Sequence, residues 1–476
     1  MSGRLDAITL PHLPAAIEGP PYAMGDVDIG VVHFGPGAFH RAHQAWYFDD
    51  ALVHDHRWGV SAVSLKSAGL RDALAAQDGL YTVAVLDESI RYRVMGSLRE
   101  RLVAADESER ERVLARLAAP ATTLVTLTIT EKGYCLRADG TLDFDHADVA
   151  ADLAAPHSPT SAIGHVVEGL RRRRAAGVAP FTTISCDNLA DNGGKLGRAV
   201  VALAHARDAE LARWIEAEAA FPRTMVDSIV PATDAALEAS VADALGVADA
   251  WPVQREAFSQ WVIERRFCNA VPDWAGIGVI VTDDVAAYER AKLRLLNGAH
   301  STLAYLGSLA GHATVADAMR DRDLAAFVER LMREDIRPNV AAPAGFDPDA
   351  YISDILRRFR NPAMRHQLAQ IAWDGSQKLP FRILGTIRDA LAAQRTIDGL
   401  CVPIAAWLHF VRRAQREGRK LVDPLAEPLF AIARECNGEA AHDVSRFLAL
   451  EAVFAEDLPR NAVFSAALRA AYAKIA

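Results

Sequence analysis

The pattern of apolar and polar positions changes its period near residue 283. Before this point, apolar runs of strand length alternate with patterns of helix length. After it, almost every apolar pattern repeats at the helical period. The helices predicted there cover residues 315–332, 351–368, 376–393, 402–417, 441–454 and 462–475. We therefore predict an α/β domain over residues 1–282 and a mostly α-helical domain over residues 283–476.

The first strand of the α/β domain, residues 28–34, leads into a turn that contains two glycines. The turn is Gly35-Pro36-Gly37-Ala38-Phe39-His40-Arg41, and a helical pattern continues through Phe48. In dinucleotide-binding folds, the backbone N–H groups of such a turn face a pyrophosphate. Because His40 stands where the full fingerprint has a third glycine, the turn alone is equally compatible with a simple strand-to-helix connection. A second strand at residues 59–65 favours a Rossmann-like dinucleotide fold.

The expected cofactor contacts come from this turn and from the end of the second strand. In the turn they are Gly35, Gly37, Ala38 and Phe39. The second strand runs into Lys66 and Ser67, at a position where many NAD-selective enzymes have a carboxylate that binds the ribose hydroxyls. We assign both residues to cofactor binding. A lysine there tolerates a 2′-phosphate, so the choice between NAD and NADP stays open.

Polar residues follow two further predicted strands. Strand 122–130 runs into Glu131-Lys132-Gly133-Tyr134, and strand 181–186 is followed by Asp187 and Asn188. Open α/β sheets bind ligands beyond the carboxyl ends of their strands, which makes Asn188 a candidate site residue, although asparagine is also common in turns. The remaining predicted elements are a hairpin of strands 81–86 and 90–95, strands 225–229 and 276–282, and helices 161–174 and 195–217.

One helix, predicted over residues 285–309, carries three polar side chains within a largely apolar sequence. At about 100° per residue, Lys292, His300 and Asn297 fall at about 0°, 80° and 140°, on one side of the helix. The surrounding leucines indicate a helix buried nearly all round, where burial favours the neutral form of an amine. Lys292 is therefore our candidate general base. The alternative is that Lys292 extends to water and the other two are hydrogen-bonded core residues.

Composition and charge exclude several classes of function. With a net charge of −9 and a pI near 5.9, the chain has no basic footprint for nucleic acid. The five cysteines are scattered without a C-x-x-C pair, which argues against a zinc site, a redox dithiol or a disulfide framework and fits a cytoplasmic setting. The N-terminus lacks an export signal and no apolar stretch approaches about 18 residues, so we expect neither export nor a membrane span.

Five stretches carry most of the polar residues singled out above. They are Gly35-Pro36-Gly37-Ala38-Phe39-His40-Arg41-Ala42-His43, Thr130-Glu131-Lys132-Gly133-Tyr134, Ser185-Cys186-Asp187-Asn188-Leu189, the run from Lys292 to His300, and Asp374-Gly375-Ser376-Gln377-Lys378. Together and in this order, they resemble the polyol-specific long-chain dehydrogenases and reductases. That family includes mannitol 2-dehydrogenase, D-arabinitol dehydrogenase and fructuronate reductase.

The resemblance implies a monomeric, metal-independent enzyme whose active site lies between a nucleotide-binding domain and a mostly helical domain. Carried over by position, it implies that Lys292 is the general base and that Asn188 and Asn297 hold the developing alkoxide. It further implies that the polyol is contacted by His300, Asp227 and Lys378. Many members have an acidic pair where this chain has residues 65–67, so we expect NAD to be preferred and NADP to be accepted.

The substrate class is left between a neutral polyol, oxidised to its 2-ketose as D-mannitol is to D-fructose, and a sugar acid. The stretches 130–134 and 374–380 resemble fructuronate reductases closely, and Lys132 is a candidate cation for a carboxylate. We favour a neutral polyol because the matched motifs show no arginine reserved for bidentate carboxylate binding. A dinucleotide-sensing module is the non-enzymatic alternative, but it would not need the catalytic residues Lys292, Asn297 and Asn188.

Overall fold

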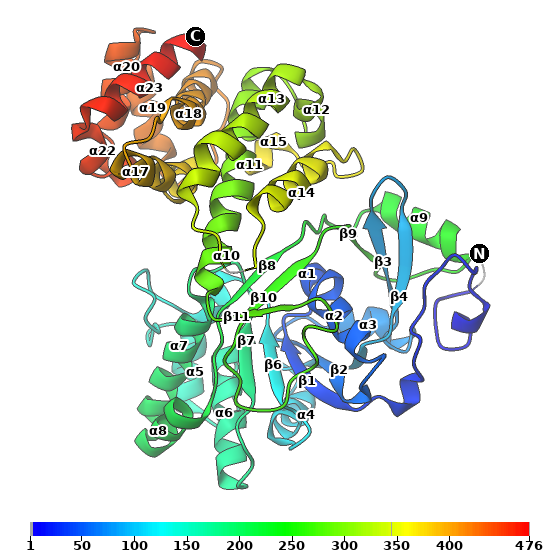
Figure 1. The fold of residues 1–476 in the computed structure, drawn as a ribbon. Coiled ribbons are helices and arrows are strands. Elements are labelled where there is room, and N and C mark those ends of the chain that lie inside the picture. The colour runs from blue at the N-terminus through cyan, green and yellow to red at the C-terminus, as the bar shows by residue number, and fades with distance from the viewer. Residues whose placement is uncertain (1–2, 344, 476) are drawn as a thin grey trace. The chain divides into compact units, whose positions relative to one another are not determined.

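The computed structural model describes residues 3–343 and 345–475. The chain divides into two compact units, Met1–Val285 and Ala286–Ala476. Within the described residues, every strand belongs to the first unit, and the second unit is built from helices (Figure 1). The predicted fold class, a Rossmann-like α/β part followed by a mostly α-helical part, is confirmed.

A five-stranded parallel sheet forms the centre of the N-terminal unit. Its strands lie in the order β5-β2-β1-β6-β7, with every neighbouring pair parallel. They are β1 (Ile29–Phe34), β2 (Gly59–Ser64), β5 (Leu98–Val103), β6 (Leu124–Leu127) and β7 (Thr182–Ser185). Because β2 and β5 extend the sheet on one side of β1 while β6 and β7 extend it on the other, the switch point lies between β1 and β6. Sheets of this type bind ligands at that point.

Three of these strands were predicted with nearly correct bounds, and two were not. The strand predicted at 122–130 ends early, at Leu127, because the Asp187 carboxylate, and not a neighbouring strand, accepts the N–H groups of Ile129 and Thr130. Strand β5 was not predicted because three charged residues occupy its middle. It lies at the edge of the sheet, where charged side chains are common because they discourage pairing with other chains.

Two three-stranded sheets complete the N-terminal unit, with strand orders β4-β3-β9 and β11-β10-β8. The predicted hairpin is confirmed as the antiparallel pair β3 (Tyr81–Leu86) and β4 (Arg91–Met95). The other strands are β8 (Thr224–Asp227), β9 (Val253–Glu256), β10 (Gln260–Glu264) and β11 (Ile280–Thr282). Strands β9 and β10 were not predicted, because they are short and begin or end in polar residues.

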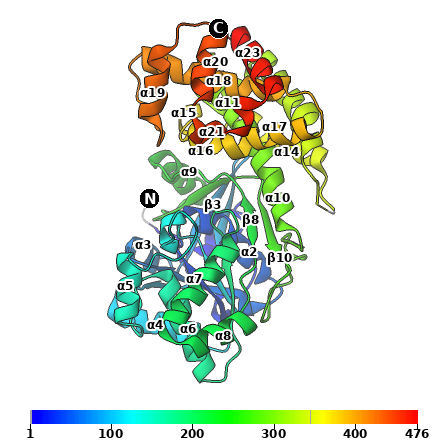
Figure 2. The same ribbon diagram turned by 90° about the vertical axis from the view of Figure 1, so that its left-hand side faces the viewer.

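Helices cover both faces of the central sheet. One layer consists of α4 (Glu107–Ala118), α6 (Ala162–Ala175), α7 (Asn192–Arg207) and α8 (Ala209–Glu218), which lie in front of the strands in Figure 2. Helices α2 (Gln44–Ala51) and α3 (Gly69–Ala75) belong to the core on the other face. Successive residues of β1 alternate between these cores, Val31 facing α2 and Val32 facing α4 and α6. A strand covered on both faces is mostly apolar, as β1 is apart from the buried His33.

The helix predicted at 195–217 is wrong as a single element. It begins earlier and is divided at Asp208, whose side chain accepts the N–H groups of Glu210 and Leu211 and so starts α8 as a new helix. The helix predicted at 161–174 is confirmed as α6, which Ser161 caps by accepting the Gly164 N–H. The N-terminal unit also contains α1 (Ala38–Ala42), α5 (Ala147–Ala154) and α9 (Ala235–Leu245).

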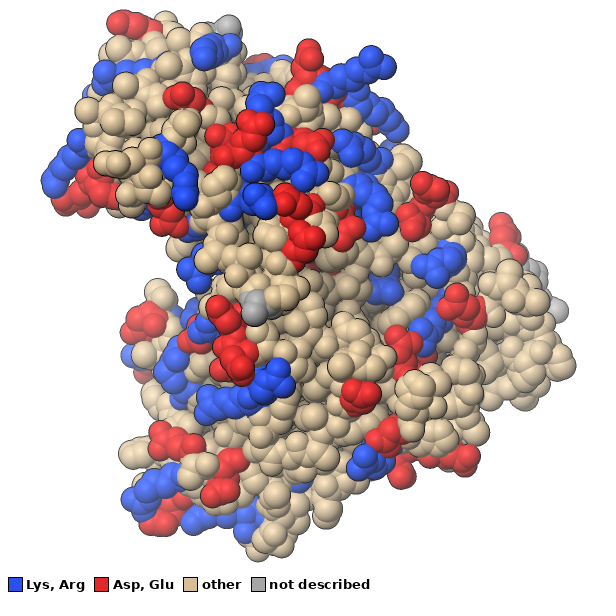
Figure 3. Space-filling view, viewed as in Figure 1, with Lys and Arg blue, Asp and Glu red and all other residues tan. Residues whose placement is uncertain are grey.

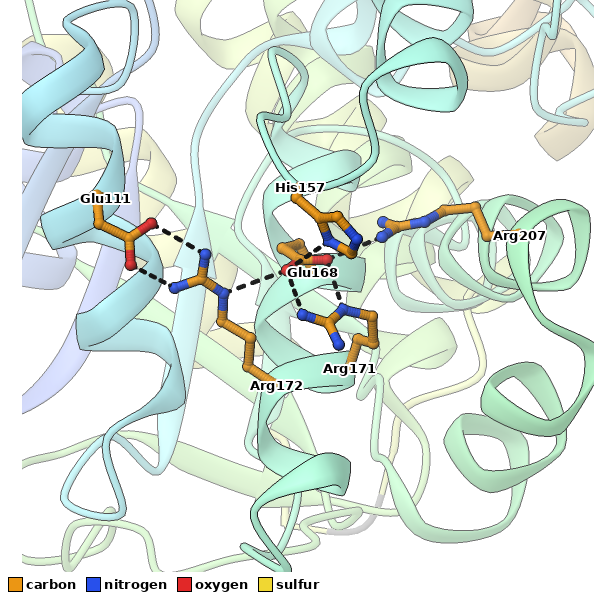
Figure 4. Close-up of polar contacts among 6 residues, drawn as sticks. All are labelled: Glu111, His157, Glu168, Arg171, Arg172 and Arg207. Atoms are coloured by element: carbon orange, nitrogen blue, oxygen red, sulfur yellow. Dashed lines mark hydrogen bonds and ion pairs between the residues drawn. The ribbon is translucent and has the colours of Figure 1, made fainter.

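Glu168 on α6 is a buried carboxylate surrounded by basic side chains (Figure 4). Its partners are Arg171 and Arg207 at 2.8 Å, and Arg172 and His157 at 3.2 Å. Burial raises the pKa of Glu168, but the hydrogen bonds from the arginines outweigh it and lower the pKa to about 2. Since Arg172 also binds Glu111 at 2.7 Å, the network joins α4, α6 and α7.

The predicted helix 285–309 is present, but it is not α-helical throughout. It consists of α10 (Val285–Ala291), a π-helical turn over Lys292–Leu296 and α11 (Asn297–Leu309). Two further π-helical segments, Leu331–Ile336 and Pro380–Leu384, interrupt other helices of the C-terminal unit. The π-helical turn at Lys292 also contacts both of these segments.

The remaining predicted helices of the C-terminal unit are present with differences in their bounds, and the one predicted at 441–454 is two separate helices. The one predicted at 315–332 is divided at Asp321, which caps a new helix, and the one at 351–368 ends at Arg360. The observed helices are α12 (Val315–Arg320), α13 (Arg322–Arg330), α14 (Pro348–Arg360), α15 (Leu368–Ile371), α16 (Gly375–Leu379), α17 (Gly385–Ala392), α18 (Asp398–Arg416), α19 (Ala426–Glu435), α20 (Ala440–Leu448), α21 (Glu451–Phe454), α22 (Asp457–Arg460) and α23 (Ala462–Ile475).

Basic and acidic side chains are interspersed over the face shown in Figure 3. This distribution agrees with the modest negative net charge and offers no broad basic surface on that face. In the part of the chain that the structure describes, no helix has the length and apolar character required to cross a membrane.

Candidate active site

The turn after β1 leaves no room for a side chain at Gly35. The residue has a φ of +85°, and a Cβ there would lie 2.2 Å from the carbonyl oxygen of Thr128. Its N–H donates to the Val63 carbonyl of β2, and its own carbonyl accepts the N–H of Gly37 at 2.7 Å. A Cβ on Gly37 would meet nothing nearer than 3.9 Å, so the outer side of the turn is open. This cradle fits the approach of a phosphate to the backbone.

The helix expected to run from this turn through Phe48 is divided in two. The backbone of His43, with φ −120° and ψ −83°, separates α1, which begins at Ala38, from α2. The ring of Phe39 stacks on that of His43, with centroids 5.0 Å apart. Of the residues predicted to contact the cofactor, Ala38 and Phe39 therefore lie in a short first helix whose end is set by His43.

His40, which replaces the third glycine of the fingerprint, is fully buried and packs flat against His33 of β1. The two ring centroids are 3.4 Å apart and the planes differ by 10°. Burial lowers the pKa of His40 well below its usual value, and it lowers the pKa of His33 to about 3, so both rings are neutral at ordinary pH. Where a glycine would let helix and strand approach, this protein fills the space with two stacked imidazoles.

Lys66 and Ser67 follow β2, at the carboxyl ends of the parallel strands, where the Gly35 turn also lies. The Lys66 side chain is 76% exposed, and its amine lies 3.5 Å from the Asp148 carboxylate. The hydroxyl of Ser67 accepts the N–H of Gly69 at 3.2 Å, just before α3. Neither side chain supplies the carboxylate that binds ribose hydroxyls in many NAD-selective enzymes.

Asp187, a residue that sequence reasoning did not single out, organises the ends of β6 and β7. Its carboxylate accepts the N–H groups of Ile129 (2.9 Å) and Thr130 (3.0 Å) and the hydroxyl of Tyr134 (2.7 Å). Burial raises the pKa of Asp187, against the effect of these hydrogen bonds. The next residue, Asn188, is exposed and so presents its amide from a backbone that Asp187 holds in place. An acid just past a strand was the only available signal.

Asp227, the last residue of β8, is buried, with 3% of its surface exposed. The position of β8 is fixed by the buried amide of Asn192, which donates to the Ser185 carbonyl at the end of β7 and to the Thr224 carbonyl at the start of β8. Asn188, which follows β7, and Asp227, the last residue of β8, therefore lie at the ends of two strands that Asn192 connects.

In the C-terminal unit, the π-helical turn changes how Lys292 and Asn297 are placed. The Asn297 N–H donates to the Lys292 carbonyl, an i→i+5 bond that puts these residues one above the other. A regular α-helix would separate them by about 140°. The expectation of a uniform 100° step is therefore wrong at this turn, and the correction brings the amide onto the face of the amine. Both side chains are partly buried.

His300, three residues further along α11, is almost completely buried. Its ring lies 4.5 Å from that of Phe359 and 5.2 Å from that of His366. Burial lowers the pKa of His300 well below its usual value, and His366, Arg358, Arg382 and Lys292 lower it further, so the ring is neutral. Among the described residues, its buried Nε2 has no hydrogen-bond partner.

Lys378 and Arg382 bring two further cations to the C-terminal unit. Lys378 on α16 lies 3.9 Å from the Asp374 carboxylate, and burial lowers its pKa. Arg382, one turn later, donates to the Ser301 hydroxyl at 3.1 Å, and burial lowers its pKa as well. Arg382 adjoins the matched motif without belonging to it, which is why the sequence did not reveal it.

One donor cluster in the described residues has the spacing of a metal site: Cys135, His146 and Asp148, with ligand atoms within 4.8 Å of one another. Its members already have other roles. His146 Nδ1 accepts the Asp148 N–H as the cap of α5, and the Asp148 carboxylate pairs with Lys66. None of the predicted site residues belongs to it, and we assign the cluster to the fold.

Comparisons with known proteins cover most of the chain. The family model described as the mannitol dehydrogenase Rossmann domain matches residues 29–276, and the one described as the mannitol dehydrogenase C-terminal domain matches residues 284–476. The chain is 41% identical to the D-mannonate oxidoreductase of Escherichia coli (strain K12), over 98% of this chain and 96% of the relative. It is 40% identical to the polyol:NADP oxidoreductase of Gluconobacter oxydans (strain 621H), over 86% of each.

Among solved structures, the chain resembles Pseudomonas fluorescens mannitol 2-dehydrogenase in its ternary complex with NAD and D-mannitol. The TM-score is 0.80 at 37% identity, covering 98% of this chain and 96% of the other. Both family models and these relatives agree in order and extent with the two units of the structure. The chain therefore belongs to the mannitol dehydrogenase family.

Proposed function

We propose that this protein interconverts a polyol and its 2-ketose, of the D-mannitol and D-fructose type, with NAD as the redox partner. The observation that carries the proposal is the π-helical turn that aligns Asn297 with Lys292. An amine that takes a proton and an amide that donates to the resulting oxygen have to reach the same hydroxyl. The unpartnered, buried Nε2 of neutral His300 on the same helix supports a polar ligand there.

We assign cofactor binding to residues 1–282. The open cradle at Gly35 and Gly37, with Ala38 and Phe39 behind it, suits a pyrophosphate, and Lys66 and Ser67 lie where the adenosine ribose belongs. When bound, the nicotinamide ring supplies the site that accepts or returns a hydride. The absence of a carboxylate at residues 65–67 supports acceptance of NADP beside NAD.

We assign the chemistry on the substrate oxygen to three side chains. Lys292 takes the proton of the reacting hydroxyl in oxidation and returns it in reduction. The amides of Asn297 and Asn188 donate hydrogen bonds to the oxygen as its negative charge develops, which is worth about 3–4 kcal/mol for each well-placed donor. His300 and Lys378, within residues 283–476, and Asp227, at the end of β8, bind the other hydroxyls of the substrate and orient its carbon chain.

A sugar acid is the second candidate substrate, because of the arginines around His300. Arg382 is partly buried, and Arg358 and Arg382 both lie close enough to His300 to lower its pKa. Guanidinium groups in such a position suit a carboxylate. The expectation of a neutral polyol was drawn from the matched motifs, which do not include Arg382. The 41% identity to a D-mannonate oxidoreductase points in the same direction.

Steady-state kinetics with D-mannitol and D-mannonate, each with NAD and NADP, distinguishes these possibilities. A larger kcat/KM for D-mannitol supports the first proposal. For the sugar-acid alternative, we expect Arg382→Met to lower kcat/KM for D-mannonate about ten- to hundredfold while D-mannitol is little affected. A protein that binds dinucleotide but turns over neither substrate class would instead support a sensing module.

We further propose that the enzyme acts as a monomer in the cytoplasm. All five cysteines are free, and three of them are buried, which fits a reducing compartment. Light scattering of the purified protein tests the oligomeric state, and a mass near twice 51.5 kDa would contradict the monomer.

A further inference from the structure

Three polar side chains form a continuous hydrogen-bonded row beneath the Gly35 turn. His33 of β1 lies between two threonines, with Nδ1 2.7 Å from the Thr126 hydroxyl and Nε2 2.9 Å from the Thr128 hydroxyl. The Thr128 hydroxyl in turn donates to the Gly35 carbonyl at 2.7 Å. His33 and Thr126 are completely buried. The row connects β6 to the turn across the switch point of the sheet.

The direction of every hydrogen bond in this row follows from its last member. The Gly35 carbonyl can only accept, so the Thr128 hydroxyl uses its proton there and has to accept from His33 Nε2. The proton of the imidazole is therefore on Nε2, and Nδ1 accepts from the Thr126 hydroxyl. This assignment requires a neutral ring, and burial lowers the pKa of His33 to about 3. One donor and one acceptor, all that a neutral imidazole has, are both used.

The end of the row controls a carbonyl that shapes the turn. The Gly35 oxygen accepts both the Thr128 hydroxyl and the Gly37 N–H, each at 2.7 Å. Fixing this oxygen fixes the peptide planes between Gly35 and Gly37, and hence the direction of the N–H groups on the open side. His33 also carries the stacked ring of His40 on α1, so it supports the turn from both the sheet and the helix.

We propose that His33, acting with Thr126 and Thr128, is a positioning residue for the dinucleotide-binding turn. The inference rests on the proposed function, because it assumes that a dinucleotide binds at Gly35 and Gly37. The Thr126 hydroxyl orients the His33 ring, the ring orients the Thr128 hydroxyl, and that hydroxyl holds the Gly35 carbonyl. None of the three side chains takes part in proton transfer to the substrate.

Thr→Val substitutions test the row because they remove a hydroxyl with almost no change of shape. NADH binding is measured by isothermal titration calorimetry, together with the melting temperature without cofactor. We expect Thr128→Val to weaken NADH binding about five- to fiftyfold. We expect Thr126→Val to weaken it less, since it acts through the ring. Thr183→Val is the matched control: it lies on the neighbouring strand β7, and its buried hydroxyl has no hydrogen-bond partner among the described residues.

The double variant Thr126→Val/Thr128→Val distinguishes a coupled row of hydrogen bonds from contacts that act independently. If Thr126 acts through His33 on Thr128, Thr126→Val has no further effect on NADH affinity once Thr128→Val is present. Additive effects of the two substitutions would overturn the proposal. So would unchanged NADH affinity in Thr128→Val, or an equal loss in Thr183→Val. Wild-type protein that binds neither NADH nor NADPH would overturn the proposed function itself, and this inference with it.

Discussion

The backbone N–H of Asn297 donates to the carbonyl oxygen of Lys292, five residues earlier. This bond defines a π-helical turn at the point where the helix carries its amine and its amide. Such turns are uncommon and are frequently found at functional sites. Here the consequence is geometric, because two side chains that an α-helix would separate by about 140° come to share a face.

We expect Lys292→Ala to lower kcat about 10²- to 10⁴-fold, the usual range for loss of a general base. Binding of NADH, measured by calorimetry, should stay close to wild type, because the role proposed for the amine is on the substrate hydroxyl. Arg290→Ala, an exposed change on the same helix, is the control and should keep full activity. Turnover within a few fold of wild type in Lys292→Ala would show that the base is misassigned.

Arg294 should be needed to hold this turn. Its guanidinium is nearly buried, and Nη1 donates to the Asn339 carbonyl at 2.7 Å and lies 2.6 Å from the Asp389 carboxylate. We expect Arg294→Met to lower kcat on the order of ten- to hundredfold through misplacement of Asn297, with NADH affinity unchanged. Asp389→Asn keeps the bond to the Asn339 carbonyl and should have a much smaller effect. Full kcat in Arg294→Met would rule out this role.

The sequence predicted those parts of the fold in which local pattern and tertiary setting agree. Strand β1 with its glycine turn, and the long helices α6, α18 and α23, follow from their apolar periods. Prediction from the sequence failed where contacts with another part of the chain determine the secondary structure. Asp208 divides a continuous helical pattern by capping its second half, and β5 is a strand because it lies beside β2 and not because its sequence alternates.

The candidate site was predictable to a similar degree. The sequence placed Lys292, Asn297 and His300 on one helix, but a π-helical turn has no simple periodic signal, so their relative directions were misjudged. Asp187 and Arg382 were missed for a different reason. Their importance comes from partners that are distant in sequence, the N–H groups after β6 for Asp187 and the hydroxyl of Ser301 for Arg382.

Cofactor selectivity should depend on the end of β2. Lys66 is mostly exposed and already faces Asp148 at 3.5 Å, so its attraction for a 2′-phosphate is weak. We expect NAD to be preferred, with NADP measurably accepted. Ser67→Asp should raise the ratio of kcat/KM for NAD over NADP by supplying a carboxylate, which can also accept the Gly69 N–H in place of the hydroxyl.

Asp148→Asn provides the opposite change, because it releases Lys66 from its carboxylate partner. We expect it to lower the NAD over NADP ratio modestly, about two- to fivefold. Measurement of kcat/KM with NAD and with NADP checks both variants, Ser67→Asp and Asp148→Asn. A ratio that neither substitution moves would show that selectivity is set elsewhere in the N-terminal unit.

The last prediction concerns Glu168, whose network of ion pairs joins three helices of the N-terminal unit. Glu168→Gln keeps the shape but leaves the surrounding arginines without their buried counter-charge, so we expect a loss of about 3–5 kcal/mol in stability at neutral pH. Glu111→Gln removes a carboxylate that also binds Arg172 but is 66% exposed, and it should cost less than about 1 kcal/mol. Thermal unfolding of both variants at pH 7 compares these losses.

The stability difference between wild type and Glu168→Gln should also depend on pH, with a definite sign. Because the pKa of Glu168 is lowered from 4.5 to about 2 in the folded chain, its protonation favours the unfolded chain. The stabilisation, on the order of 3 kcal/mol, is complete above about pH 4.5 and is lost as the pH falls toward 2. The difference in melting temperature between wild type and Glu168→Gln should therefore shrink over this interval, while the difference for Glu111→Gln stays small throughout. A difference for Glu168→Gln that is constant from pH 7 to pH 3 would contradict the lowered pKa and would attribute the loss to packing alone.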